Sequence, residues 1–264
     1  MTAPLFLADP GSLDEASPGS TVRLGGDEAR HARSVRRLRD GETVDIADGC
    51  GRRVSGVVVP SSPDALVVEV AAVHDDPAPT RRIIAIQALA KGDRGERAVE
   101  TLTEVGVDVI VPWSARRSIT QWTAQKAERG IAKWRSTARE AAKQSRRSRV
   151  PEIADPADLN AAVEWIAHAG AAFLLDARGE PLPDLIAEDR PDGDWLIVIG
   201  PEGGFEGEEY ARFVQAGARE ASLGPTVLRT STAGTVAAGI IAAADRWSAP
   251  SGSRVDPVMT GSNS

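Results

Sequence analysis

The stretch IGPEGGF, residues 199–205, decides the fold prediction together with LGPTVLRT, residues 223–230. The first stretch follows an apolar run at 195–199 that is typical of a buried strand, and the second directly precedes an alanine-rich segment that favours a helix. In α/β folds, ligands bind where loops leave the ends of strands. Glycines let main-chain N–H and C=O groups approach a bound molecule because no Cβ blocks the way. The two loops therefore predict a cofactor site.

The chain from residue 82 to about residue 248 alternates apolar runs with helix-like segments. Continuous apolar strands separated by helices predict a mainly parallel sheet covered on both faces. We expect strands at 82–89, 109–112, 172–175 and 196–199, and helices at 93–106, 123–144, 155–170, 206–216 and 235–247.

Two of these helices begin with capping signals. Asp93 is followed three residues later by Glu96, which predicts a capping box. Asp155 is followed by Pro156, which predicts an N-cap with proline at the first helical position. The sequence therefore places the starts of both helices at these aspartates.

Residues 1–73 form a separate, β-rich unit. Short apolar or alternating segments at 44–48, 54–59 and 65–70 are divided by Gly, Pro and Asp, and we expect a small barrel or sandwich with one short helix at 27–37. The polar, proline-bearing segment 74–81 predicts an exposed linker. Residues 249–264 are rich in Ser, Gly and Pro, and they predict a disordered tail.

The composition narrows the class of protein. The chain of 264 residues is 42% hydrophobic and 26% charged, as in soluble globular proteins. A single cysteine, Cys50, excludes an internal disulfide and a cysteine-rich zinc site, so we expect no metal and a reducing, cytoplasmic location. No apolar run approaches the roughly 18 residues of a membrane span, so we expect no membrane partner.

Basic residues gather in two clusters although the net charge is -7. The net charge argues against a protein that coats nucleic acid through bulk charge. Each cluster alone is compatible with a solvated helix face, but two clusters in an acidic chain favour local contact with phosphates. The first cluster comprises Arg30, Arg33, Arg36, Arg37 and Arg39 beside His31; the second comprises Lys126, Arg129, Lys133, Arg135, Arg139, Lys143, Arg146, Arg147 and Arg149.

Missing motifs count against several reaction classes. The chain has no G-x-G-x-x-G after a strand, no G-x-x-x-x-G-K-[ST] and no G-x-S-x-G. The usual dinucleotide fingerprint, the nucleoside-triphosphate loop and the nucleophile elbow are therefore absent. The two glycine loops contain no evident nucleophile, and they suit main-chain hydrogen bonding to a neutral or zwitterionic ligand.

Taken in order, these motifs resemble one family over nearly the whole chain up to about residue 248. The chain is similar to the bacterial small-subunit ribosomal RNA uridine N3-methyltransferases, the RsmE family of the SPOUT superfamily. It departs from the family at Ser231, where the segment Leu-Arg-Thr-Glu-Thr-Ala usually has Glu. The resemblance rests on the segments 31–39, 91–96, 104–107, 116–118, 133–134, 140–151, 199–205, 222–224 and 228–230.

The resemblance implies a fold, a cofactor and partners. The fold is α/β, with a SPOUT-type trefoil-knotted parallel-sheet domain at 82–248 preceded by a small PUA-like β-barrel RNA-binding domain at 1–73. The partners are 16S ribosomal RNA or the small ribosomal subunit, and a second copy of the chain in a homodimer that completes the RNA site. The methyl donor is S-adenosyl-L-methionine, which we expect at Leu175, Gly200, Glu202, Gly203, Gly204, Leu223, Gly224 and Leu228.

The expected chemistry assigns roles to charged residues. N3 of uridine must lose its proton before it attacks a methyl group, so the site needs to orient the methyl donor and the base in line and to stabilise the anion electrostatically, and a protein base is optional. Arg229, beside the second loop, is our first choice for stabilising the anion. Glu202 is the nearest carboxylate in the sequence and is a candidate base. For RNA contact we expect Arg30, Arg33, Arg36, Arg37, Lys91, Arg94, Arg116, Arg117, Arg146 and Arg147.

Two other functions stay open at the level of sequence. The first is a non-catalytic RNA-binding protein with a degenerate SPOUT-like domain, which Ser231 favours. The second is a small-molecule enzyme that uses the glycine loops for another nucleotide.

Overall fold

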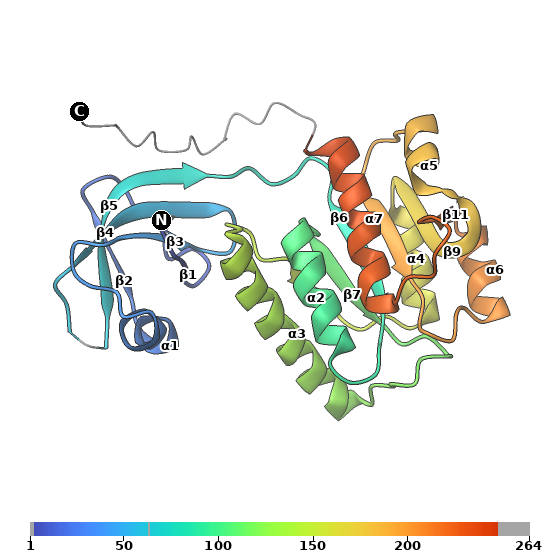
Figure 1. The fold of residues 1–264 in the computed structure, drawn as a ribbon, viewed down its shortest axis with the longest axis horizontal. Helices are drawn as coiled ribbons and strands as arrows, with labels where there is room; N and C mark the ends of the chain where they lie inside the picture. The colour runs from blue at the N-terminus through green and yellow to red at the C-terminus, as the bar shows by residue number, and fades with distance from the viewer. Residues whose placement is uncertain (1–2, 63, 248–264) are drawn as a thin grey trace.

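The N-terminal domain is a five-stranded sheet with a short helical segment beside it (Figure 1). The computed structural model describes residues 3–62 and 64–247. The strand order is β1-β3-β4-β5-β2, with β1 parallel to β3 and the other pairs antiparallel. The elements are β1 (Leu5–Leu7), β2 (Thr21–Leu24), α1 (Gly26–Arg30), the π-helical turn η1 (His31–Val35), β3 (Thr43–Ala47), β4 (Arg52–Val59) and β5 (Leu66–Asp75).

The alternation of exposed and buried side chains explains how the strands of this sheet cover the domain core. In β2 the exposed Thr21 and Arg23 alternate with the buried Val22 and Leu24, so one face of the strand is covered. The register between β4 and β5 shifts after Ser55, beside Gly56. A Cβ on Gly56 would lie 2.2 Å from the carbonyl oxygen of Glu69, so only glycine fits at this bulge. Strand β5 continues to Asp75, which places the first two residues of the expected linker within the sheet.

The C-terminal domain contains a six-stranded sheet in the order β11-β9-β10-β6-β7-β8, and all its pairs are parallel. Every residue of β6, β7 and β10 is buried, as expected for a sheet covered on both faces. The prediction of a mainly parallel sheet is confirmed. The strands are β6 (Ile83–Ala88), β7 (Val109–Trp113), β8 (Glu152–Ile153), β9 (Ala171–Pro181), β10 (Trp195–Ile199) and β11 (Arg219–Ser222).

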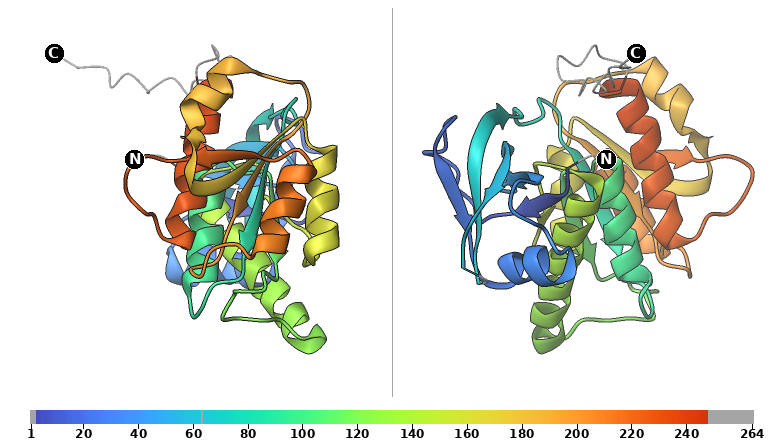
Figure 2. Two further views of the ribbon diagram at one scale, coloured as in Figure 1. Left: turned by 90° about the vertical axis from the view of Figure 1, so that its right-hand side faces the viewer. Right: turned by 60° about the vertical axis from the view of Figure 1, so that its left-hand side comes forward.

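Helices cover both faces of this sheet (Figure 2, left). Leu102, Trp134, Leu185 and Ala238 share one hydrophobic core with the sheet, and Phe213 belongs to the core on the other side. The first face carries α2 (Arg94–Val105), α3 (Ala124–Ser145), α5 (Leu182–Glu188) and α7 (Thr230–Asp245); the second carries α4 (Leu159–His168) and α6 (Gly207–Gln215). No helix in the described ranges is long and apolar enough to cross a membrane.

The capping prediction at Asp93 is wrong. Asp93 precedes α2, but its side chain makes no capping hydrogen bond, because its backbone (φ -83, ψ 0) is not in the extended conformation of an N-cap. Glu96 binds Lys133 of α3 at 2.6 Å instead. A long-range ion pair with Lys133 therefore takes the place of the predicted capping box.

Two helix starts also differ from prediction. Helix α4 begins at Leu159, and Asp158 caps it by accepting from the main-chain nitrogen of Ala161 at 2.9 Å. Asp155 does not cap it, because Ala157 still hydrogen-bonds to Pro112 of β7 at 2.7 Å, which keeps the chain extended. Helix α7 begins at Thr230, five residues before the predicted start at Thr235. The predicted disordered tail, 249–264, lies outside the described residues.

Candidate active site at the carboxyl edge of the parallel sheet

Four loops emerge at one edge of the C-terminal sheet. Because all six strands are parallel, the segments after β6, β7, β10 and β11 leave at the same edge. These segments contain Lys91, the loop 114–123, the glycine loop 200–206 and the loop 223–229. The two stretches singled out from the sequence are thereby brought to the same side of the fold.

A surface cavity of about 130 Å³ lies between β9 and the loop after β11. Four of the residues predicted to hold a cofactor line this cavity: Leu175, Leu223, Gly224 and Leu228. The other four predicted residues, Gly200, Glu202, Gly203 and Gly204, do not line it and belong to the adjacent glycine loop.

Part of the main chain around the cavity makes no hydrogen bond to any described residue. Strand β9 pairs with β11 up to Leu174 and again from Glu180, so residues 175–179 lie outside the ladder. Among the described residues, no hydrogen bond uses a main-chain group of residues 224–228. Gly224 has φ +113, a conformation that favours glycine. The cavity therefore offers free N–H and C=O groups to a ligand.

The glycine loop is fixed by packing beside this cavity. Thr230 donates through Oγ1 to the carbonyl oxygen of Gly200 at 3.0 Å, which joins the loop to the start of α7. A Cβ on Gly200 would lie 2.9 Å from the ring of Phe205. That ring stacks on Trp113 at 5.8 Å. Gly204, with φ +70, has open space where a Cβ would stand.

Guanidinium groups surround the glycine loop. Arg94 binds Glu202 at 3.1 Å, and Arg117 donates to the carbonyl oxygen of Gly203 at 3.2 Å. Arg116 pairs with Glu206 and Glu208, each at 2.9 Å, and the hydrogen bond to Glu206 raises the pKa of the Arg116 guanidinium.

Arg229 lies at the N-cap of α7, directly after the loop that lines the cavity. Its side chain is exposed and makes no hydrogen bond or ion pair with residues 3–62 or 64–247. Its guanidinium is therefore available to a substrate.

Two arginines expected to contact RNA instead hydrogen-bond to other parts of the folded chain. Arg147 donates to the carbonyl oxygens of Thr103 and Val107, both at 2.8 Å, and burial lowers its pKa. Arg33 donates to Leu38 at 3.2 Å and binds Asp40 at 3.0 Å. Each of these guanidinium groups holds main-chain carbonyls at the end of a helix or turn, so neither is free for a phosphate.

The remaining predicted RNA contacts lie on the surface in separate places. Arg30 pairs with Asp27 on α1, and Arg37 is exposed with φ 56. Arg36 and Arg146 line a cavity of about 100 Å³ between the two domains. Lys91 lines a groove beside the start of α3.

Asp176 is a site residue that the sequence prediction missed. It lines the 130 Å³ cavity beside Leu175. Arg178 hydrogen-bonds its carboxylate at 2.9 and 3.0 Å, and this interaction lowers the pKa of Asp176. Its position directly after the buried run 172–175 was the available signal, since loops that follow strands bear ligands.

Ser231, which stands at the family's Glu position, is 8% exposed in the first turn of α7. No carboxylate is therefore present at this point of the site. Within the described ranges, no group of three or more His, Cys, Asp or Glu side chains could hold a metal ion.

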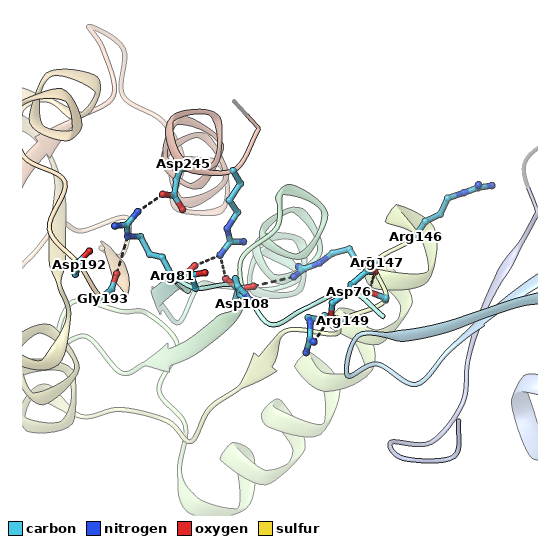
Figure 3. A pocket seen from close by; sticks show the side chains of 13 residues that line it. Asp76, Arg81, Asp108, Arg146, Arg147, Arg149, Asp192, Gly193 and Asp245 are labelled. Carbon is cyan, nitrogen blue, oxygen red and sulfur yellow. Dashed lines mark hydrogen bonds and ion pairs between the residues drawn. The ribbon is translucent and has the colours of Figure 1, made fainter. Parts of the chain in front are cut away.

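A cavity of about 800 Å³ lies at the opposite edge of the sheet and between the domains (Figure 3). Its walls form a chain of alternating charges in which Asp108 binds Arg246 and, at 3.7 Å, Arg147. Arg149 donates to the carbonyl oxygen of Asp76 at 2.6 Å. Figure 3 shows Arg146 pointing away from this network. The network ties the linker to the C-terminal domain, and the cavity is remote from the glycine loops.

Comparison with known families agrees with this geometry. Residues 76–242 match the RNA methyltransferase domain family, and residues 24–71 match the RNA methyltransferase PUA domain family. The two matches define the class: an RNA methyltransferase domain that follows a PUA domain.

Individual relatives indicate which family of RNA methyltransferases the chain resembles. The ribosomal RNA small subunit methyltransferase E of Mycobacterium tuberculosis is 37% identical over 94% of this chain and 95% of its own length. The protein of the same name from Bacillus subtilis is 28% identical over 81% of this chain and 86% of its own length. A Legionella pneumophila methyltransferase, solved with bound SAM, is 26% identical, with a TM-score of 0.79 over 92% of this chain and 98% of that one.

The chain belongs to the ribosomal RNA small subunit methyltransferase E family. The predicted fold class, a SPOUT-type parallel-sheet domain behind a PUA-like domain, is confirmed. These matches do not test the predicted trefoil knot.

Proposed function

We propose that the protein transfers a methyl group from S-adenosyl-L-methionine to N3 of a specific uridine in 16S ribosomal RNA. The observation that carries the proposal is the meeting, at one edge of the sheet, of a cavity with free main-chain groups and of Arg229, whose side chain has no partner in the described part of the chain. Membership of the family supports the reaction class.

The residues of the cavity suit S-adenosyl-L-methionine, which supplies a methyl group carried on a sulfonium. Leu175, Leu223 and Leu228 offer apolar surface for an adenine ring. The free main-chain groups of 224–228 offer donors and acceptors for its polar edge. The Asp176 carboxylate can accept hydrogen bonds from ribose hydroxyls or face a cationic group.

Arg229 and Glu202 carry the proposed chemistry. Arg229 binds the uracil as its N3 proton leaves, because a fixed guanidinium stabilises the anion that develops there. Glu202 accepts the proton; its Oε1 binds Arg94, which holds the carboxylate in place. The target base leaves its stack to reach this edge of the sheet.

The RNA-facing surface combines both domains. Arg30, Arg36, Arg37, Lys91 and Arg146 are exposed cations, and Arg94, Arg116 and Arg117 surround the glycine loop. We place the reaction in the cytoplasm, where ribosomal RNA of a bacterial type is processed. Fractionation that finds the protein outside the cytoplasm would contradict this location.

We also propose that the chain forms the trefoil knot implied by the resemblance. After the edge strand β11, the chain returns so that α7 packs in the core shared with α2. A crystal structure in which segment 223–229 does not thread through a loop of the chain would contradict the knot.

We infer a homodimer from the outer face of α7. Val236 is 37% exposed on this helix, Trp247 just beyond it is 63% exposed, and Val227 before it is 90% exposed. Val236→Glu should convert the dimer to a monomer, because it places a charge in an apolar interface. Sedimentation measures this, with Val214→Glu on α6, 40% exposed, as the matched control. A wild-type monomer, or two variants that sediment alike, contradicts the inference.

Calorimetry and methyl transfer test the proposed function. We expect the purified protein to bind S-adenosyl-L-methionine and to transfer tritium from labelled donor to 16S RNA, with the product mapped as N3-methyluridine by mass spectrometry. Binding of RNA without binding of donor would identify a non-catalytic RNA-binding protein. Binding of donor without transfer to RNA would favour a small-molecule enzyme.

Replacing Gly204 by valine should abolish donor binding. Valine is strained at φ +70, and its side chain would enter the open space beside the loop. Gly19→Val is the matched control, since Gly19 also has positive φ (+85) and open space but lies in the N-terminal domain. Both variants should lose about 1–2 kcal/mol of stability, but only Gly204→Val should lose affinity in calorimetry. Gly203→Val should behave like Gly204→Val, because its Cβ would lie 3.2 Å from Arg117. Normal donor affinity in both loop variants removes the loop from the site.

A further inference from the structure

A basic groove lies beside the glycine loop and is not used by the proposed chemistry. We use this name for the cavity of about 490 Å³ whose walls include Lys91, Ile119, Trp122, Lys126 and Arg129. Lys91 follows β6, the two other cations lie in the first turns of α3, and the loop 114–123 forms the floor between them.

The shape of the groove is fixed by contacts of its floor. Thr120 donates through Oγ1 to the carbonyl oxygen of Ala90 at 3.1 Å, and Gln121 donates to Ala115 at 2.8 Å. Trp122 packs edge-on against Trp134, with ring centroids 5.4 Å apart. A Cβ on Gly130 would lie 2.4 Å from the Trp122 ring, so this ring rests directly on the backbone of α3.

The three cations of the groove are not neutralised. Lys91, Lys126 and Arg129 form no ion pair with any residue of the described ranges, and neither do their sequence neighbours Asp93 and Glu128. Other cations of this edge are paired: Arg94 with Glu202, and Lys133 with Glu96. The first turn of α3 contains no acidic residue, so Lys126 also opposes the helix dipole. In a chain with net charge -7, such a group selects anions.

Apolar surface accompanies these charges. Ile119 is 70% exposed at the rim of the groove. Cations next to an exposed apolar side chain suit single-stranded nucleic acid, because its phosphates are attracted to the cations and an unstacked base can bury part of its apolar face against that side chain. A folded duplex offers phosphates but keeps its bases stacked away from such a side chain.

The groove lies where RNA next to the target nucleotide would pass. The loop 114–123 touches the glycine loop through Arg117, which donates to Gly203 at 3.2 Å, and it lines the groove through Ile119 and Trp122. A strand that delivers a base to the glycine loop therefore passes next to the groove.

We propose that the basic groove binds the single-stranded segment of ribosomal RNA that flanks the methylated nucleotide, with phosphates on Lys126, Arg129 and Lys91 and a base against Ile119. This proposal rests on the proposed function, since it takes the target nucleotide to lie at the glycine loop.

Charge reversal tests the groove. Lys126→Glu/Arg129→Glu should weaken binding to 16S RNA from cells lacking this gene by about tenfold or more at moderate salt, because two phosphate contacts become repulsive. The slope of log affinity against log salt should become shallower by about 1.4, at roughly 0.7 per lost phosphate contact on a single strand. Both altered side chains are exposed, so folding should persist.

The matched control is Arg190→Glu/Arg212→Glu, which makes the same charge change outside the groove. This control should retain the wild-type salt slope. In methyl transfer, the groove variant should raise KM for RNA and leave kcat and donor affinity nearly unchanged. Ile119→Ala should raise KM without changing the salt slope.

Three results overturn the proposal. The first is a groove variant that equals wild type in affinity and salt slope. The second is a control that loses as much affinity as the groove variant. The third is a loss of binding to assembled subunits alone, which would indicate a ribosomal protein as the partner. Failure of the proposed function gives a different result, since wild type would then transfer no methyl group while the RNA-binding measurements still report on the groove.

Discussion

Arg229→Ala should lower kcat for methyl transfer by about 100- to 1,000-fold, the usual loss when a preorganised anion-stabilising group is removed. Arg229 is exposed at the N-cap of α7, and its side chain has no hydrogen-bond or ion-pair partner among the described residues, so truncating this side chain breaks no polar contact of the fold. The affinity for S-adenosyl-L-methionine should stay within about twofold, because this side chain acts on the base and does not line the donor cavity.

The pH profile separates this role from simple RNA attraction. Without the guanidinium, formation of the N3 anion depends more on hydroxide, so the residual activity of Arg229→Ala should rise more steeply with pH than that of wild type. Arg229→Lys should recover part of kcat, since it keeps the charge but loses the planar fork. Arg212→Ala, on α6, should have wild-type kcat. An Arg229→Ala variant with raised KM and normal kcat would assign this residue to RNA binding alone.

Asp108→Ala should lower the free energy of unfolding by about 3–5 kcal/mol, the typical cost of removing one partner of a buried ion pair. The Asp108 side chain is only 12% exposed, and it accepts from the main-chain nitrogen of Ile83 at 2.8 Å. It also binds Arg246 and Arg147 at the junction of the domains (Figure 3). Its loss leaves two partly buried guanidinium groups without their shared carboxylate.

Urea denaturation measures this effect, and Asp155→Ala is the matched control. Asp155 is exposed and does not cap α4, so its replacement should change the stability by less than about 0.5 kcal/mol. The comparison also tests the corrected start of α4. Equal stabilities of the two variants would show that the charge network does not hold the junction together.

Most of the framework follows from local patterns. The apolar runs at 83–86 and 195–199 became the buried strands β6 and β10, because strands covered on both faces need mostly apolar residues. Helix α3 runs over Ala124–Ser145, close to the predicted 123–144. The two glycine loops were located by their motifs, and parallel strands then necessarily bring them to one edge.

Two of the errors share one cause, which is competition from distant partners. Glu96 binds Lys133 on another helix rather than the backbone of its own. Arg147 looks like a free cation in the sequence, but its guanidinium binds carbonyls of Thr103 and Val107. A residue type and its spacing specify what a side chain can donate, whereas only the packed chain specifies which acceptor is within reach.

The sequence by itself determined the two-domain order, the parallel sheet, the glycine loops and the family, because these depend on apolar periodicity, turn residues and motifs that are local in the chain. Only the tertiary structure decided which arginines are free, where Asp176 lies, and that Lys91 meets Lys126 and Arg129 in one groove. The physical reason is that burial and charge neutralisation depend on the distances between residues far apart in the chain, and these distances exist only once the helices have packed on the sheet.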